Sequence, residues 1–284
     1  MYQDPAALRR RLQRELRGYR SAAQMTQRDV ADAMDWSPSK LIRIESGAVA
    51  VSTNDLRALL THYGVTDTEV IDDLVSTAKS SKKSSWSEYR DVISQASATY
   101  FGYEASAAVI RQFQPSLIPG LLQTEEYMRR VFEDVLLPAG KDVERLVRAR
   151  LERQELLDRE VLPEMFFILD EAALTRPVGG AGTWRRQLDH LEQLSTRPNI
   201  AIQIVPFRAG AYPGQMGPFI LLEFSDDDTL LYLESQSDTV SRDDPEQIGR
   251  YLDAFWDIER NKSTAPGELP ALIAKAKREL EGAV

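Results

Sequence analysis

The sequence predicts a two-domain protein, with five short helices in an all-helical domain at residues 1–78 and a larger α+β domain at residues 88–284. Three observations predict this α + (α+β) class. Apolar residues recur every three or four positions through the first 78 residues, the period of an amphipathic helix. A small, polar and basic stretch at residues 79–87 has the composition of a solvated linker. Beyond it, helical patterns mix with short, strand-like apolar runs.

Composition and charge indicate a globular protein whose charge is unevenly spread. Hydrophobic residues make up 43% of the chain and charged residues 28%, with a formal net charge of −9. Residues 1–83 carry a net +2, however, and the remainder a net −11. The absence of cysteine excludes disulfides, thiolate metal sites and cysteine nucleophiles. No apolar run approaches the ~18 residues needed to span a bilayer, so we expect a cytoplasmic protein.

The first two helices follow from apolar spacing and a capping signal. Apolar residues of the first recur at helical spacing: Leu8, Leu12, Leu16 and Tyr19. Thr26 begins the second helix in a capping box with Asp29, which satisfies free backbone donors at the helix start. The buried stripe of this short helix is Val30, Ala31 and Met34.

Asp35-Trp36 makes the turn into a third helix. Ser37 can act as its N-cap, and Pro38 can occupy the first helical position, where a missing N–H costs nothing. The helix ends at Gly47, because glycine best tolerates the left-handed conformation beyond a helix C-terminus. Its buried residues are Leu41 and Ile44.

The fourth and fifth helices complete the N-terminal domain. Ser52 and Asp55 form another capping box, which begins the fourth helix. Apolar spacing continues this helix and predicts the fifth: Leu56, Leu59, Leu60, Tyr63, Val70, Ile71 and Leu74.

A helix, a tight turn and a second helix with small and basic residues form the arrangement that places one helix in the DNA major groove. Small residues at the start of helix 37–46 allow close approach to base edges, and Lys or Arg can reach the N7 and O6 acceptors of guanine. The predicted base-reading residues are Pro38, Ser39, Lys40 and Arg43. Two other interpretations remain open, a solvated basic face and a helical protein-interaction module of the same fold.

This stretch resembles the Xre/Cro-type helix-turn-helix regulators, which are related to phage repressors and have a lambda-repressor-like fold. The resemblance is carried by Thr26, Gln27, Val30, Ala31, Met34, Ser37, Leu41, Ile44, Glu45, Ser46 and Gly47. It implies contacts to DNA phosphates from Gln27, Ser37 and Ser46. It also implies an ion pair between Arg20 and Glu45. Asp35 departs from the glycine that the family usually places in the turn, although Asp tolerates that backbone better than most residues.

The C-terminal region mixes strands and helices. Its apolar runs predict strands at residues 164–170, 200–207, 217–224 and 229–235. Helical periodicity predicts helices around Val109 and at residues 125–136, 143–157, 183–194, 245–259 and 270–280. The last two strands, joined across residues 225–228, predict a β-hairpin.

Most of this region resembles the domain that follows the Xre-type domain in WhiJ-like regulators of actinomycetes. The carriers are "PSLIPGLLQTEEY" (115–127), "RLERQELL" (150–157), "ILDEAALTRPVGG" (168–180), "IAIQIVPFRAGAYPGQMGPFILLEF" (200–224) and "LLYLES" (230–235). The resemblance implies regulation of development or secondary metabolism and a small partner protein encoded nearby.

Three features of the sequence could carry chemistry. Asp170-Glu171 could place two carboxylates at a strand end for catalysis, but paired acids there more commonly begin the next helix. Residues 179–182, a Gly-Gly-Ala-Gly stretch, could hold a phosphate on backbone donors, but they lack the lysine and Ser/Thr of a P-loop, which favours a simple turn. His62 and His190 have no second ligand at metal spacing, so we predict no metal site.

The loop at residues 208–219 mixes Gly and Pro with large side chains. Such loops close over ligands or bind peptide partners, and they also simply turn corners. If this loop senses a ligand or a partner, the candidate contacts are Tyr212, Met216 and Phe219.

Together these features predict a sequence-specific DNA-binding transcriptional regulator, with no catalytic residues, no cofactor and no membrane association. One such helix reads only a few base pairs, so we expect a homodimer on an inverted-repeat operator in double-stranded DNA. The α+β domain would provide dimerisation and the sensing of a ligand or partner. Two alternatives remain: an antitoxin-like or partner-sequestering protein whose DNA binding is only autoregulatory, and an enzyme fused to a DNA-binding domain.

Overall fold

The structure is a computed structural model that describes residues 3–82, 85–136, 142–234 and 239–281. The chain divides into two compact units, Met1–Glu88 and Tyr89–Val284. The first is all-helical and the second combines helices with a sheet, which confirms the predicted α + (α+β) class. Within the described ranges, no helix is both long and apolar enough to cross a membrane.

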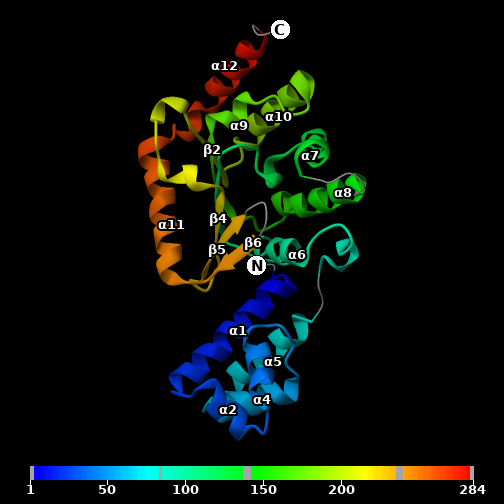
Figure 1. Cartoon of the computed structure of the whole chain (residues 1–284), viewed down its shortest axis with the longest axis vertical. Coiled ribbons are helices and arrows are strands. Elements are labelled where there is room, and N and C mark those ends of the chain that lie inside the picture. The colour runs from blue at the N-terminus through cyan, green and yellow to red at the C-terminus, as the bar shows by residue number, and fades with distance from the viewer. Residues whose placement is uncertain (1–2, 83–84, 137–141, 235–238, 282–284) are drawn as a thin grey trace. The chain divides into compact units, whose positions relative to one another are not determined.

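Among its described residues, the N-terminal unit contains five α-helices, coloured blue to cyan in Figure 1. They are α1 (Pro5–Ala22), α2 (Gln27–Ala33), α3 (Pro38–Glu45), α4 (Thr53–His62) and α5 (Thr68–Ser80). Apolar side chains from all five share one core, which includes Leu12, Leu16, Val30, Leu41, Ile44, Leu56, Leu59, Leu60 and Leu74. These are the stripes that the apolar spacing predicts.

Local caps explain where most of these helices begin. Asp4 accepts a hydrogen bond from the Ala6 backbone N–H at 2.8 Å, at the start of α1. Thr26, Ser52 and Asp67 cap α2, α4 and α5 in the same manner. Short polar side chains satisfy N–H groups that otherwise have no partner in the first turn. The start of α3 is different and is described with the site below.

The C-terminal unit is built around a six-stranded mixed sheet in the order β3-β2-β1-β4-β5-β6. Its strands are β1 (Val109–Gln114), β2 (Glu164–Asp170), β3 (Ile200–Val205), β4 (Phe219–Glu223), β5 (Thr229–Glu234) and β6 (Thr239–Arg242). The first three strands are parallel to one another, and the other three join in antiparallel fashion. The β4–β5 pairing confirms the predicted hairpin across residues 225–228.

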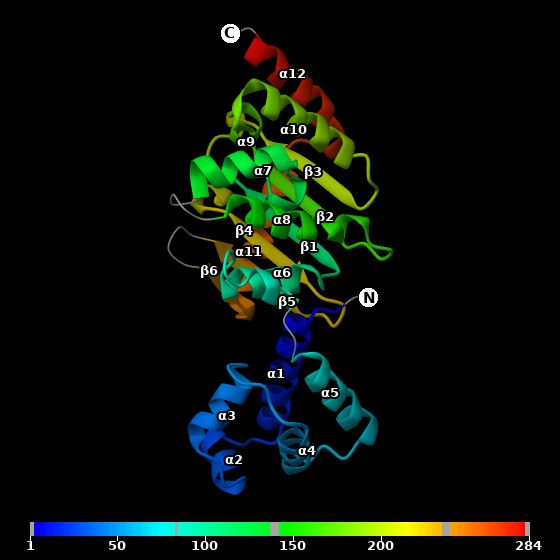
Figure 2. The ribbon, with the colours of Figure 1, turned by 90° about the vertical axis from the view of Figure 1, so that its right-hand side faces the viewer.

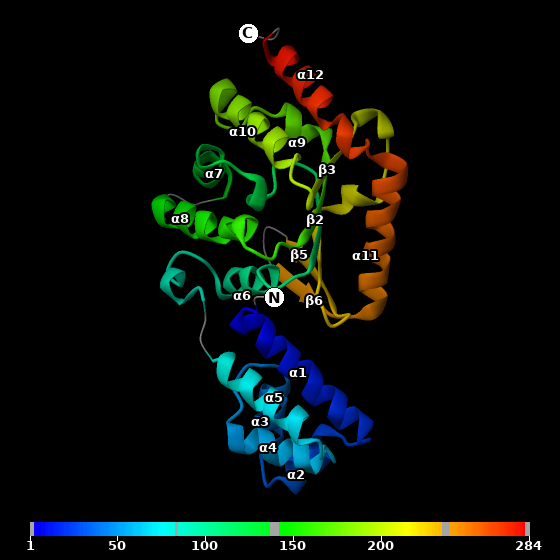
Figure 3. The same ribbon diagram turned by 180° about the vertical axis from the view of Figure 1, so that it is seen from behind.

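Helices cover both faces of this sheet (Figures 2 and 3). One face packs against α6 (Gln95–Glu104), α7 (Glu125–Val131), α8 (Val143–Gln154), α9 (Glu171–Thr175), α10 (Gly180–Leu194) and α12 (Leu269–Glu281). The other face packs against α11 (Pro245–Asp257). Each face of the sheet has its own hydrophobic core. Along β1, Ile110 lies in the core on the α6 side and Phe113 in the core on the α11 side, because successive side chains of a strand point to opposite faces.

A buried ion pair joins α6 to α8. The Arg153 Nε donates to Glu104 Oε2 at 2.5 Å, and its Nη2 donates to Glu104 Oε1 at 2.7 Å. The Tyr100 hydroxyl also donates to Glu104 Oε1, at 2.5 Å. Burial, followed by the Glu104 charge, raises the pKa of Tyr100 well above its usual value, so the hydroxyl remains a donor. The cluster fixes two helices that are far apart in the sequence.

The structure corrects five expectations. The residues around Val109 form strand β1 and not a helix. Helix α6 and strand β6 lie where no element was predicted, and α10 begins at Gly180 and not at residue 183. Helix α5 continues to Ser80, into the stretch interpreted as a linker, where Trp86 is also buried.

Candidate nucleic-acid interface

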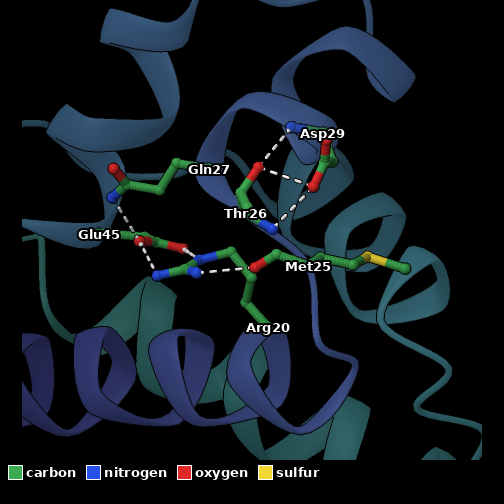
Figure 4. A network of polar contacts seen from close by, with 6 residues as sticks. All are labelled: Arg20, Met25, Thr26, Gln27, Asp29 and Glu45. Atoms are coloured by element: carbon green, nitrogen blue, oxygen red, sulfur yellow. Dashed lines mark hydrogen bonds and ion pairs between the residues drawn. The ribbon is translucent and has the colours of Figure 1, made fainter.

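Helix α2 begins with a complete capping box (Figure 4). The Asp29 backbone N–H donates to Thr26 Oγ1 at 3.2 Å, and the Thr26 backbone N–H donates to Asp29 Oδ2 at 3.0 Å. The Thr26 hydroxyl also donates to Asp29 Oδ2, at 2.7 Å. These bonds, the hydroxyl's above all, lower the pKa of Asp29 because they favour its charged form. The box that the sequence predicts is therefore present.

The turn between α2 and α3 depends on one residue in a left-handed conformation. Asp35 has φ 54°, in the region that glycine adopts most easily. The next residue closes the turn, because the Trp36 N–H donates to the Ala31 carbonyl at 2.8 Å. Asp35 thus makes the turn at the position where the family that the sequence resembles usually has glycine.

Ser37 and Pro38 begin α3, but without a side-chain cap. Ser37 is extended at the N-cap position and Pro38 is the first helical residue, as predicted. The Ser37 hydroxyl makes no capping hydrogen bond and lies 3.1 Å from the Ser39 hydroxyl. Pro38 has no N–H, and the Lys40 N–H donates to the Ser37 carbonyl at 2.9 Å. The Ser39 N–H is therefore the donor that this first turn can offer to an anion such as a phosphate.

The outward face of α3 carries five exposed residues, Pro38, Ser39, Ile42, Arg43 and Ser46. The opposite face is buried, with Leu41 0% and Ile44 4% exposed. Among the described residues, the Arg43 guanidinium forms no ion pair. Three of the four predicted base-reading residues therefore share one accessible stripe with Ser46. Sequence reasoning missed Ile42, although it lies three residues from Ser39 on the same face.

Lys40, the fourth predicted base-reading residue, has partners within the unit. Its Nζ lies 3.2 Å from Asp55 Oδ2, in the first turn of α4. The same Nζ lies 3.6 Å above the centre of the Trp36 ring, a cation–π contact. The side chain thus braces α3 against α4 and the turn.

Glu45 joins three elements of the unit (Figure 4). Its carboxylate accepts hydrogen bonds from Arg20 Nε at 2.7 Å and Nη2 at 3.1 Å, the ion pair that the resemblance implied. It also accepts one from Gln27 Nε2 at 2.8 Å. Arg20 in turn donates to the Met25 carbonyl at 2.9 Å. The hydrogen bond to Glu45 raises the pKa of Arg20, and burial, then the Glu45 charge, raises the pKa of Tyr63 to about 12.

Gln27 therefore has a fixed side chain at the first position of α2. Its carboxamide is half-buried and is oriented by Glu45 from the last turn of α3. Ser46, the other predicted phosphate ligand besides Ser37, is exposed, and its hydroxyl donates to the Arg43 carbonyl at 3.3 Å. The predicted phosphate ligands thus lie at both ends of the two-helix motif.

The structure places two of the candidate residues of loop 208–219 in the core of the C-terminal unit. Tyr212 is buried, and its hydroxyl donates to Asp170 Oδ2 at 2.5 Å. Phe219 is 3% exposed in strand β4 and packs against Phe113 with ring centroids 5.7 Å apart. Both side chains belong to the core beneath α11. The side chain of Met216 lies outside the described residues.

The other candidates of that unit have structural partners. Asp170 caps α9 by accepting the Ala172 N–H at 2.9 Å, and Glu171 accepts the Phe207 N–H at 2.7 Å. Gly179, at φ 76°, is the N-cap of α10. Burial, followed by the Arg197 charge, lowers the pKa of His190.

Comparison with known protein families gives two matches. Residues 11–72 match the family described as "Helix-turn-helix domain". Residues 97–265 match the family described as "Domain of unknown function (DUF5753)". Neither the comparison with curated proteins nor the comparison with solved structures found a match. Because the second match spans more than half of the 284 residues, the chain belongs to the DUF5753 family, and it carries a helix-turn-helix domain ahead of that region.

Proposed function

We propose that this protein is a sequence-specific DNA-binding transcriptional regulator that reads the major groove with α3. The observation that carries the proposal is the exposed stripe of α3, held on a helix-turn-helix frame. Its members are small, except for Ile42 and Arg43, so the helix backbone can come close to base edges. The Arg43 guanidinium is accessible and can donate two hydrogen bonds to a guanine.

Phosphate contacts position the helix in this proposal. Gln27 Nε2 has two hydrogens and uses one for Glu45, which leaves the other for a phosphate oxygen. At the uncapped start of α3, the Ser39 N–H can donate to a second phosphate, because Pro38 has no N–H and the Lys40 N–H donates to the Ser37 carbonyl. Ser46 contacts a third phosphate. These contacts add affinity on every sequence, whereas the stripe on α3 selects among sequences.

Lys40 can join the base contacts only by leaving Asp55. The ion pair is partly exposed, at 39% for Lys40 and 33% for Asp55, and such pairs contribute only about 0–1 kcal/mol. The approach of DNA can therefore release the lysine at low cost. In our proposal Arg43 makes the principal base contact and Lys40 a secondary one.

Two further parts of the proposal concern assembly and ancestry. A single α3 reads too few base pairs for useful discrimination, so we propose a homodimer on an inverted repeat, with the C-terminal unit providing the dimer contact and a sensing surface. The Asp35 turn, the Glu45 ion pair and the Gln27 position support an Xre-type classification. A WhiJ-like role in development or secondary metabolism, with a small partner protein, rests on sequence resemblance.

Selection of random duplex DNA by the full-length protein at near-physiological salt tests the proposal. We expect an inverted repeat to be recovered, and Arg43→Ala to weaken binding to it by about 1–3 kcal/mol with relaxed preference at one position. Arg148→Ala is the matched control, because it removes an exposed arginine from α8 in the other unit. Recovery of no sequence above background, or equal losses in the two variants, would refute the assignment of α3.

A further inference from the structure

We infer that Ile42 is a specificity-determining residue that reads the C5-methyl group of a thymine in the operator. The inference deepens the proposed function and rests on it, because it takes α3 to lie in the major groove. Ile42 is 47% exposed, and it is the one large hydrophobic side chain exposed in the N-terminal unit among the residues that the structure describes.

The position of Ile42 makes this exposure informative. Single exposed apolar residues are ordinary on protein surfaces, so exposure by itself carries no function. Ile42, however, lies at the middle of the exposed stripe, one turn after Ser39 and one turn before Ser46. Its neighbour Arg43 is the accessible cation of the same stripe. A helix that inserts this stripe into a groove necessarily places Ile42 against base edges.

The chemistry of the groove leaves one match for this side chain. Base edges in the major groove present hydrogen-bond donors, acceptors and the thymine methyl group, and the methyl group is the only apolar one in unmodified DNA. A branched aliphatic side chain cannot form a hydrogen bond with a donor or an acceptor of a base edge. If it packed against such a polar group, it would remove the group's water without replacing the hydrogen bond. Ile42 is therefore complementary to thymine and unfavourable against the polar edge of a cytosine.

The helix geometry also places the thymine relative to the guanine. Ile42 and Arg43 are consecutive in the chain, so their positions differ by about 1.5 Å along the helix axis and about 100° around it. Base pairs follow one another every 3.4 Å or so along the duplex. We therefore expect the thymine within about two base pairs of the guanine that Arg43 contacts.

Lys40 supports the same assignment of roles. Its Nζ is occupied by Asp55 and by the Trp36 ring, so the centre of the exposed stripe contains one apolar and one cationic side chain. This pairing predicts a half-site that contains a guanine and a thymine at fixed separation.

The test uses the full-length protein and the operator recovered by selection. Each thymine is replaced singly by deoxyuracil, which removes the methyl group and leaves base pairing intact, and binding is titrated. We expect one thymine per half-site whose replacement lowers the affinity of the parent about 3- to 5-fold. This is the effect expected when one methyl group is no longer buried. Ile42→Ala should show no loss at that position, and Ile42→Val a smaller loss than the parent.

Arg43→Ala is the matched control, because it should keep the sensitivity to deoxyuracil at the thymine. Thermal unfolding of each variant checks the fold, which we expect to be retained because Ile42 is half-exposed. A parent insensitive to every replacement, a half-site without thymine, or a sensitivity that persists in Ile42→Ala would overturn the inference while specific binding stands. Failure to recover any operator would instead overturn the proposed function.

Discussion

Glu45 accepts three side-chain hydrogen bonds at the candidate interface. Its side chain is 2% exposed and accepts hydrogen bonds from α1 through Arg20 and from α2 through Gln27. A buried carboxylate is tolerated only when its charge is compensated and its oxygens are bonded, and both conditions are met here. One residue thus joins the last turn of α3 to both α1 and α2.

Replacing Glu45 should therefore destabilise the N-terminal unit. Glu45→Gln removes the countercharge of Arg20, whose side chain is only 17% exposed, and we expect a loss of about 3 kcal/mol. The control is Asp72→Asn, which breaks the exposed ion pair of Asp72 with Arg57 and should cost about 0–1 kcal/mol. Hydrogen exchange of the α3 amides in the full-length protein measures both, and similar effects in the two variants would contradict the prediction.

At the scale of elements, the helices of the N-terminal unit are largely specified by local signals. The capping box of α2, the proline at the start of α3 and the apolar stripes all coincide with the observed helices. For the box predicted at α4, the structure shows the Ser52 half, in which the hydroxyl accepts the Asp55 N–H at 3.0 Å. Some elements of the C-terminal unit are not specified by local signals in this way. In α6 the buried residues Ala98, Tyr100, Gly102 and Glu104 are two positions apart and form no helical stripe. That helix is stabilised instead by the Arg153–Glu104 pair.

The capping box of α2 should show a characteristic pH dependence. The folded-state pKa of Asp29 lies below its unfolded value, so the cap adds stability above the unfolded pKa, and this stability is lost as the pH falls through the folded pKa. Thr26→Ala removes the hydroxyl that is the largest cause of the shift, so it should raise the pKa of Asp29 back towards the ordinary value of an aspartate. Carboxyl NMR titration of parent and variant measures this, and identical titration curves would show that the hydroxyl has no such effect.

At the scale of the whole molecule, charge is divided between the two units. Residues 1–83 carry a net +2 and the remainder a net −11. So small a positive charge provides little non-specific attraction to DNA, which depends on the number of phosphates neutralised. Useful affinity must then come from base contacts and from the joint binding of two half-sites, which is why the proposed function includes a homodimer.

This reasoning predicts a strict dependence on half-site spacing. Inserting five base pairs between the half-sites moves the second one to the opposite side of the duplex, about half a helical turn away. A homodimer then loses one of its two contacts, and we expect affinity to fall on the order of 100-fold. Binding titrations on the recovered operator and on the operator with five inserted base pairs measure the loss of affinity. Sedimentation of the free protein measures whether it is a dimer. Unchanged affinity would indicate that each chain binds alone.

The sequence by itself determined the fold class, the five N-terminal helices, the side-chain caps at Thr26 and Ser52, and the β4–β5 hairpin. These features depend on neighbours within a few positions, such as Thr26 with Asp29, and on hydrophobic periodicity. The stripe of α3 was also largely readable, because Leu41 and Ile44 define its buried face.

The tertiary structure alone decided the features that depend on distant partners. Residues around Val109 became a strand because β2 and β4 flank them, and Tyr212 and Phe219 were drawn into a core beneath α11 and away from solvent. Lys40 pairs with Asp55, and Ile42 is exposed on the stripe between Ser39 and Ser46. Each outcome depends on contacts across the fold, which sequence spacing does not encode, and these contacts decide which α3 side chains remain free for DNA.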